Sequence, residues 1–341
     1  MRAARVSFCL GWLLAAGCCH LPMRQPAPPP PPLPQELSTQ FNYPRTVALD
    51  AKEQETTHRS RYEIKRIEMA ALPDRFDTNR LLRLDYYAPH REGRKPVVLV
   101  LPISGGGYPL EKHVSAYFAR RGWAAVIVRR RKLPREPVNG EELSAVLGQS
   151  IIDARRALDW IETRPELDAT KIGVFGVSMG GIKAALLAPV DKRVQATVSG
   201  LAGGDIPYIL RHTTEPGIMR RRERILKEHH LQLDEFEARL RAGFACDPNM
   251  LGPYVPRDKV LLVLACFDRA VPIRKGRELR DTMGRPETIF LPTGHYSALL
   301  CLSYLQHESF KFLRKRLYSP QPKESHLSGQ RVTGALLPGS P

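Results

Sequence analysis

Residues 172–181 read IGVFGVSMGG, so that an apolar run leads directly into the pentapeptide GVSMG at 176–180. The apolar run is typical of a buried strand, and the residues after the pentapeptide have the composition of a helix. A serine at a sharp strand-to-helix turn needs small neighbours, because the turn strains its backbone. Gly176 and Gly180 meet that need, and the segment therefore predicts a nucleophile at Ser178.

A serine hydroxyl is a weak nucleophile at neutral pH and needs an imidazole as base, with a carboxylate that orients the imidazole. Asp268 directly follows the apolar run 260–267, and His295 follows the last candidate strand at 288–291. The chain order Ser, Asp, His is the one expected with this type of turn. We therefore predict a triad of Ser178, Asp268 and His295.

Other residues compete for two of these roles. Asp205 follows the candidate strand at 196–198, one strand earlier than Asp268, and Asp247 is a weaker contender. His295 is preferred as the base because it follows the final strand. The competing histidines, which fall on predicted helices, are His113, His229, His230 and His307.

The negative charge that develops on an attacked carbonyl oxygen needs backbone N–H donors. Met179, the residue after the nucleophile, is expected to supply one donor, and the glycine-rich loop 102–107 the other. In that loop Ser104 is the preferred donor, with Ile103 and Gly105 as alternatives. The loop has neither the Gly-Lys-Ser/Thr of a phosphate loop nor a G-x-G-x-x-G pattern, so no nucleotide site is predicted.

Short apolar runs separated by segments of helical period fill the middle of the chain. Such runs are typical of parallel strands that are buried on both faces and connected by helices. The alternating stretches at 62–69 and 82–87 instead predict antiparallel entry strands, and 304–317 predicts a terminal helix. We predict an α/β fold with a doubly wound, mostly parallel sheet. The expected buried strands are 97–101, 124–128, 172–175, 196–198, 260–265 and 288–291.

The interval after the predicted strand 196–198, which is the sixth when the two entry strands are counted, is too long for one connecting helix. It predicts a helical insertion at about 205–250. Its apolar residues either line an acyl or alcohol pocket or pack the insertion onto the sheet. The arginines at 220–222 are expected on a solvated helix face, with binding of an anionic substrate group as the alternative. The apolar positions are Ile209, Leu210, Ile218, Met219, Leu226, Leu233, Phe236 and Leu240.

The first residues have the pattern of an export signal. Arg2 and Arg5 precede an apolar stretch at 6–17, which is shorter than the roughly 20 residues of a membrane-spanning helix, so an uncleaved transmembrane anchor is the weaker alternative. The ending resembles a bacterial lipobox and implies lipidation at Cys18. Ala15 departs from the usual leucine, and ordinary signal-peptidase cleavage is the alternative. We predict an exported, lipid-anchored protein of the bacterial envelope, in the periplasm or at the outer membrane.

Composition gives the remaining boundaries. Residues 1–18 are assigned to the signal peptide, 19–61 to a proline-rich tether and linker, 62–317 to the folded domain and 318–341 to a disordered tail. The three domain cysteines lack the C-x-x-C pairing of a zinc site, so no metal is predicted, while one disulfide stays open. They are Cys246, Cys266 and Cys301.

The chain has 52 Lys and Arg residues against 35 Asp and Glu residues, and a formal charge of +17. Such a charge favours contact with anionic surfaces. The basic runs at 129–132, 220–222 and 314–316 have no interleaved aromatic residues and no accompanying nucleic-acid-binding motif. We therefore expect solvated faces, no nucleic-acid partner and a monomer.

From about residue 62 to 317 the chain resembles an α/β-hydrolase and is similar to bacterial dienelactone-hydrolase-like and acyl-peptidase-like serine esterases. The resemblance implies acyl transfer through an acyl-serine, no cofactor, and an insertion that covers the site as a lid. Two departures matter: Pro102-Ile103 replaces the usual His-Gly, and the dienelactone enzymes use cysteine where this chain has Ser178. The motifs that carry the resemblance are 168–173, 176–181, 268–272 and Gly294-His295.

The sequence thus predicts a serine hydrolase that cleaves a small-molecule ester. Ser178 attacks the acyl carbon, His295 carries the proton, Asp268 orients His295, and water releases the acyl group. An acyl-peptidase or a thioesterase on the same triad is the nearest alternative. A non-catalytic envelope-binding lipoprotein is the alternative from a different class.

Overall fold

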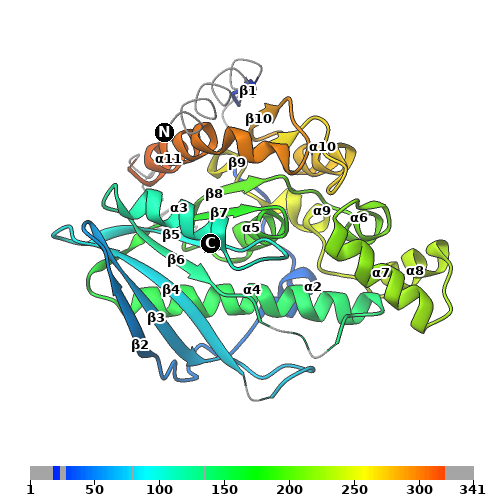
Figure 1. The fold of residues 1–341 in the computed structure, drawn as a ribbon, viewed down its shortest axis with the longest axis horizontal. Coiled ribbons are helices and arrows are strands. Elements are labelled where there is room, and N and C mark those ends of the chain that lie inside the picture. The colour runs from blue at the N-terminus through cyan, green and yellow to red at the C-terminus, as the bar shows by residue number, and fades with distance from the viewer. Residues whose placement is uncertain (1–17, 24–27, 79, 132, 134, 319–341) are drawn as a thin grey trace, which may run out of the picture.

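The computed structural model describes residues 18–23, 28–78, 80–131, 133 and 135–318. The strands are β1 (Cys19–Leu21), β2 (Lys52–His58), β3 (Tyr62–Ala70), β4 (Leu81–Pro89), β5 (Lys95–Leu101), β6 (Ala124–Val128), β7 (Leu167–Val177), β8 (Val194–Gly200), β9 (Val260–Ala265) and β10 (Glu287–Leu291). They form one sheet in the order β1-β10-β9-β8-β7-β5-β6-β4-β3-β2 (Figure 1).

The centre of the sheet is parallel and its two ends are antiparallel. Strands β10, β9, β8, β7, β5 and β6 pair with one another in parallel. The strands β1 at one end and β4, β3 and β2 at the other pair antiparallel. The predicted α/β fold with a mostly parallel sheet and antiparallel entry strands is therefore confirmed.

Helices cover both faces of the sheet (Figure 1). The helices are α2 (Gln35–Ser38), α3 (Pro109–Ala119), α4 (Gly140–Glu162), α5 (Met179–Val190), α6 (Ile206–His212), α7 (Pro216–Glu228), α8 (Leu233–Arg241), α9 (Pro248–Leu251), α10 (Ile273–Thr282) and α11 (Leu302–Tyr318). Helices α3 and α11 share one apolar layer with the sheet, and α4, α5 and α10 share the other.

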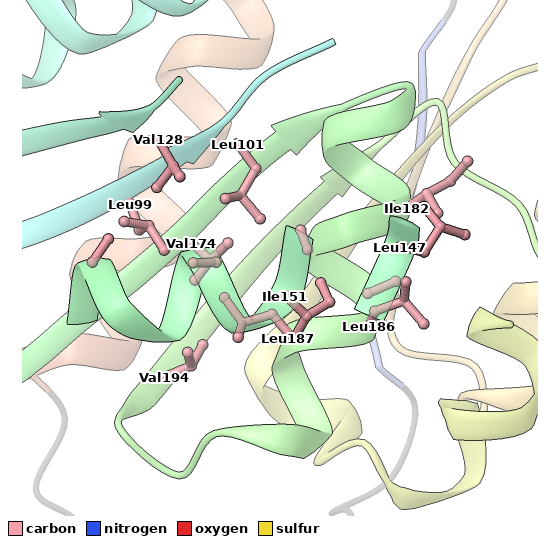
Figure 2. Packing of buried hydrophobic residues seen from close by; sticks show 14 of the residues in the cluster. Leu99, Leu101, Val128, Leu147, Ile151, Val174, Ile182, Leu186, Leu187 and Val194 are labelled. Carbon is pink, nitrogen blue, oxygen red and sulfur yellow. The ribbon is translucent and has the colours of Figure 1, made fainter. Parts of the chain in front are cut away.

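Side chains alternate along a strand, and the core accordingly has one layer on each face of the sheet. Val98 of β5 belongs to the layer under α3 and α11, whereas its neighbour Leu99 belongs to the layer under α4 and α5. Figure 2 shows the second layer, where Leu99 lies among Val174 of β7 and Ile151 of α4. All four side chains are fully buried. Burial on both faces explains why the central strands are continuously apolar.

The predicted insertion consists of α6 to α9, between β8 and β9. Helix α8 contacts both α6 and α4, so the insertion is tied to the body of the domain. Its apolar positions differ in their surroundings: Ile209 and Leu240 are buried in the core, whereas Leu233 is 41% exposed. These residues were predicted either to line a pocket or to pack the insertion onto the sheet. Packing therefore applies to some of them.

The predicted boundary at Tyr62 is corrected, because the segment assigned to a tether and linker contributes to the domain. Strand β2 pairs with β3, and Phe41 is fully buried. Arg155 donates to the Phe41 carbonyl at 2.7 Å, and Arg156 donates to the Val47 carbonyl at 2.8 Å. The sequence concealed β2 because its residues, KEQETTH, have no apolar alternation and form an exposed edge.

Candidate active site

Ser178 lies at the turn between β7 and α5, with φ of 56°. Its N–H donates to the Gly200 carbonyl at 2.8 Å, which fixes the turn against β8. A Cβ on Gly176 would lie 2.0 Å from the Gly180 carbonyl oxygen, and one on Gly180 would lie 2.1 Å from that of Leu101. The close backbone approach therefore requires glycine at both positions, and it projects Ser178 from the end of the sheet.

Three side chains from separate strand ends form one chain of hydrogen bonds. His295 Nε2 lies 3.0 Å from Ser178 Oγ, and His295 Nδ1 lies 2.7 Å from Asp268 Oδ2. The other oxygen of Asp268, Oδ1, accepts the backbone N–H groups of Ala270 and Val271, both at 2.9 Å. Because an ionised carboxylate only accepts, Nδ1 carries the proton and the Nε2 lone pair faces the serine hydroxyl. The structure thus brings together the three residues of the predicted triad.

The two competing acids have other partners. Asp205 pairs with Lys275 at 2.7 Å and with Arg241 at 2.9 Å. The Asp247 carboxylate accepts the backbone N–H groups of Asp205 and Ile206, which anchors the start of α6. Both carboxylates therefore have structural contacts, and the carboxylate that reaches the imidazole is that of Asp268.

The expected oxyanion donors border the same turn. Met179 is the first residue of α5, so its N–H lies among the amides that a helix leaves unpaired at its positive end. In the early loop, the Ile103 N–H donates to Glu111 Oε1 at 2.7 Å, which removes the Ile103 alternative. Ser104 lines a pocket together with Met179. Ser104 as the second donor stays a prediction, with Gly105 as its alternative.

Sequence reasoning missed the residues that hold this loop. Glu111 of α3 is 2% exposed and accepts the Ile103 N–H. Arg130 donates to the Gly106 carbonyl, and its own N–H donates to the Tyr108 hydroxyl. A glutamate in the first turn of a helix that begins with proline was the available signal. Its partner, eight residues earlier, depends on the path of the loop.

The pocket beside Ser104 and Met179 runs between α4 and the insertion. The predicted lining role therefore applies to Leu210, Ile218, Phe236 and Leu240. Other apolar lining residues are Leu143 and Leu147 of α4 and Ile225 of α7.

Basic side chains also line this pocket. For 129–131 this corrects the expectation of a solvated run, because these side chains are partly buried, whereas Arg220 and Arg221 are exposed, as expected for a solvated helix face. Arg129, Arg130, Arg131, Arg221 and Arg222 line it together with Lys183 of α5. Residue 132 lies outside the described residues. Sequence reasoning missed Lys183, although it is the one charged residue of α5, whose other members are apolar or small.

Within the described ranges, no group of three or more His, Cys, Asp or Glu side chains is arranged to hold a metal ion. No helix in that same part of the chain has both the length and the apolar character needed to cross a bilayer. Residues 1–17 of the predicted signal peptide (1–18) and residues 319–341 of the predicted tail (318–341) lie outside the described residues, whereas Tyr318 is the last residue of α11 and not part of a tail. Cys18 is partly buried beside Cys301, and burial raises the pKa of its thiol to about 11. Lipidation at Cys18 stays a prediction.

Residues 84–207 match the model of the dienelactone hydrolase family, a stretch that contains Ser178 but neither Asp268 nor His295. An uncharacterised protein of Mycobacterium tuberculosis is 29% identical over 149 residues, which are 43% of this chain and 33% of that protein. The chain thus spans about a third of that relative's length.

Solved structures of esterases have the same fold. The acetyl xylan esterase from Paenibacillus sp. R4 superposes with a TM-score of 0.62 at 20% identity, over 83% of this chain and 92% of that one. Acetyl xylan esterase 1 from Thermoanaerobacterium sp. gives a TM-score of 0.60 at 18% identity, over 88% of this chain and 100% of that one. Together with the parallel sheet and the strand–turn–helix around Ser178, these likenesses establish that the chain has the α/β-hydrolase fold.

Proposed function

We propose that this protein is a serine esterase. The observation that carries the proposal is the continuous hydrogen-bonded chain from Ser178 through His295 to Asp268. A serine Oγ at 3.0 Å from the imidazole Nε2 is within reach for proton transfer. The family match over 84–207, and solved structures of esterases with the same fold, support ester hydrolysis as the reaction.

In the first half of the reaction, His295 Nε2 takes the proton of Ser178 while Oγ forms a bond to the acyl carbon. The carbonyl oxygen takes up negative charge and is stabilised by the N–H of Met179 and that of Ser104. The carbon–oxygen bond to the alcohol then breaks. The alcohol leaves with the proton from His295, and an acyl-serine remains.

In the second half, His295 takes a proton from water, and the resulting hydroxide attacks the acyl-serine. Collapse of this intermediate returns the proton to Ser178 Oγ and releases the carboxylic acid. Asp268 keeps the imidazole in one tautomer and stabilises its protonated form throughout. Its own position is held by the N–H groups of Ala270 and Val271.

A fluorophosphonate probe, which reacts with activated serines, tests this proposal on the full-length chain. We expect labelling of the wild type and of Ser303→Ala, whose serine lies exposed on α11, and none of Ser178→Ala. Hydrolysis of 4-nitrophenyl acetate should fall about 10⁴-fold or more in Ser178→Ala. Absence of labelling in the folded wild type would overturn the proposal and favour the binding lipoprotein. Comparing an ester, an anilide and a thioester of one acid then decides between esterase, acyl-peptidase and thioesterase.

We separately propose export and lipid anchoring through Cys18, supported by the basic start, the apolar stretch and the lipobox-like ending of the sequence. Metabolic labelling with a palmitate analogue in a bacterial host, comparing the wild type with Cys18→Ser, tests it. Labelling of the wild type alone is the expected result. Unlabelled wild-type protein that still contains residue 18 would exclude the anchor.

A further inference from the structure

The charged residues around the pocket leave positive charges without counter-ions. Five of its charged lining residues, Glu136 among them, have partners close by. Arg129 pairs with Asp85, Arg131 with Asp74, Arg221 with Glu136, and Asp153 with Arg80.

The other three lining cations, Lys183, Arg130 and Arg222, have no carboxylate within ion-pair distance in the described part of the chain. Arg130 donates to the Gly106 carbonyl and Arg222 to the Leu210 carbonyl, which are neutral partners. Cations in an apolar setting are costly unless a negative charge accompanies them. The wall of the pocket therefore has three positive charges that the protein does not neutralise.

Lys183 is the most directly placed of the three. It lies on α5, five residues after the nucleophile, among apolar neighbours. Burial lowers the pKa of its ammonium to about 8, and Arg130 and Arg131 lower it while Asp153 raises it. Asp153 itself is engaged by both Nη atoms of Arg80, at 2.5 and 3.2 Å. The ammonium thus faces the pocket without a committed partner.

The position of the pocket indicates which half of the substrate it takes. His295 protonates the leaving alcohol, so the alcohol lies on the His295 side of the nucleophile. The pocket is instead bordered by Ser104 and Met179, on the oxyanion side, and by the apolar side chains of α4 and the insertion. An acyl chain therefore fits here, with its methylene groups against the leucines.

We propose that this site, taken as the esterase proposed above, prefers acyl groups that carry a second, negatively charged group, and that Lys183 is the residue that selects them. An ester of a dicarboxylic acid has the required chemistry. Its free carboxylate replaces the missing counter-ion of Lys183, with Arg130 and Arg222 adding to the positive field. Charge-assisted hydrogen bonds in a desolvated setting are the stronger class of such bonds.

Two esters that differ only in charge test the proposal on the full-length chain: mono-4-nitrophenyl adipate and its methyl-capped, neutral counterpart. After subtraction of spontaneous hydrolysis, we expect the wild-type kcat/KM to favour the anionic ester by about tenfold. Lys183→Met, which keeps the apolar stem, should lower this ratio about tenfold. Lys227→Met is the matched control. It makes the same change of residue and charge at an exposed position on α7 of the insertion. A ratio near one in the wild type, or an equal ratio in Lys183→Met, would overturn the proposal.

A binding measurement separates this proposal from the esterase proposal. Calorimetric titration of Ser178→Ala with adipate should give a Kd that weakens about tenfold when Lys183→Met is added. Lys183-dependent adipate binding without ester turnover would leave the anion site standing and reject the esterase. Equal turnover of both esters with no adipate binding would support the esterase and reject the anion site. A Lys183→Met change that lowers adipate affinity no more than Lys227→Met would also overturn the proposal.

Discussion

The nucleophile turn and the helical insertion meet at the same pocket, yet they are specified in different ways. At the turn, the backbone leaves no space: a Cβ on Gly176 or Gly180 would lie 2.0 or 2.1 Å from a carbonyl oxygen. In the insertion, Phe236 and Leu240 lie on α8, which contacts α4, and they share one buried cluster with residues far away in sequence. The proposed chemistry thus depends on local steric constraints, whereas the proposed selection of the acyl group depends on long-range packing and charge.

The largest expected effect concerns the three side chains that meet at the nucleophile turn. In Asp268→Asn, the amide oxygen must stay on the N–H groups of Ala270 and Val271, which turns the NH₂ toward His295 Nδ1. The imidazole then carries its proton on Nε2 and cannot accept one from Ser178. We expect kcat to fall about 10⁴-fold. Steady-state kinetics on 4-nitrophenyl acetate check this, with Asp205→Asn as the control whose kcat stays within about threefold.

A smaller effect tests the steric basis of the turn. In Gly180→Ala the added methyl group meets the Leu101 carbonyl, so the turn must shift. We expect the free energy of unfolding to fall by about 3 kcal/mol. Displacement of Ser178 should lower kcat/KM about a hundredfold. Urea unfolding and kinetics measure both quantities. Gly107→Ala, which adds a methyl with nothing within 4 Å, should match the wild type, and equal behaviour of the two variants would refute the steric argument.

The third prediction concerns the loop 102–107, whose Ser104 lines the pocket together with Met179 and residues of the insertion. Glu111 holds the Ile103 N–H through Oε1, while its Oε2 is buried without a hydrogen-bond partner. Glu111→Gln weakens that bond and should lower kcat about tenfold with KM changed less than twofold, because the oxyanion donor moves. Glu141→Gln, an exposed change at the start of α4, is the control. A rise in KM alone would place Glu111 in binding instead.

The smallest expected effect is a pH dependence of the preference for the anionic ester. Since the pKa of Lys183 is lowered to about 8, its positive charge is present below pH 8 and is lost above it. The neighbouring charged groups are Arg130, Arg131 and Asp153, and Asp153 is paired with Arg80. The preference for the anionic adipate ester should therefore fall about threefold between pH 7 and pH 9. Both esters depend on the same catalytic base, so the effect of its titration cancels in the ratio of their kcat/KM values. In Lys183→Met this ratio should not change with pH.

The sequence was most informative where short-range rules apply. The continuously apolar runs predicted the central strands, since burial on both faces removes the need for alternation. The pentapeptide at 176–180 predicted the turn, and Asp268 and His295 were found because each comes shortly after a strand, β9 and β10 respectively. The polar strand β2 escaped prediction, since an exposed edge strand needs no apolar residues. The arginines at 129–131 looked solvated because a charge run by itself does not show which wall it faces.

By itself, the amino-acid sequence determined the α/β class, the turn and the identity of the three side chains that meet at it. These follow from periodicity, from the steric needs of one backbone turn, and from the rule that parallel strands end at a common edge. Only the tertiary structure decided that the domain begins before Tyr62, that Glu111 holds the loop 102–107, and that Lys183 lines the pocket without a carboxylate at ion-pair distance among the described residues. Such features depend on which distant residues become neighbours, and burial and charge balance are properties of that neighbourhood.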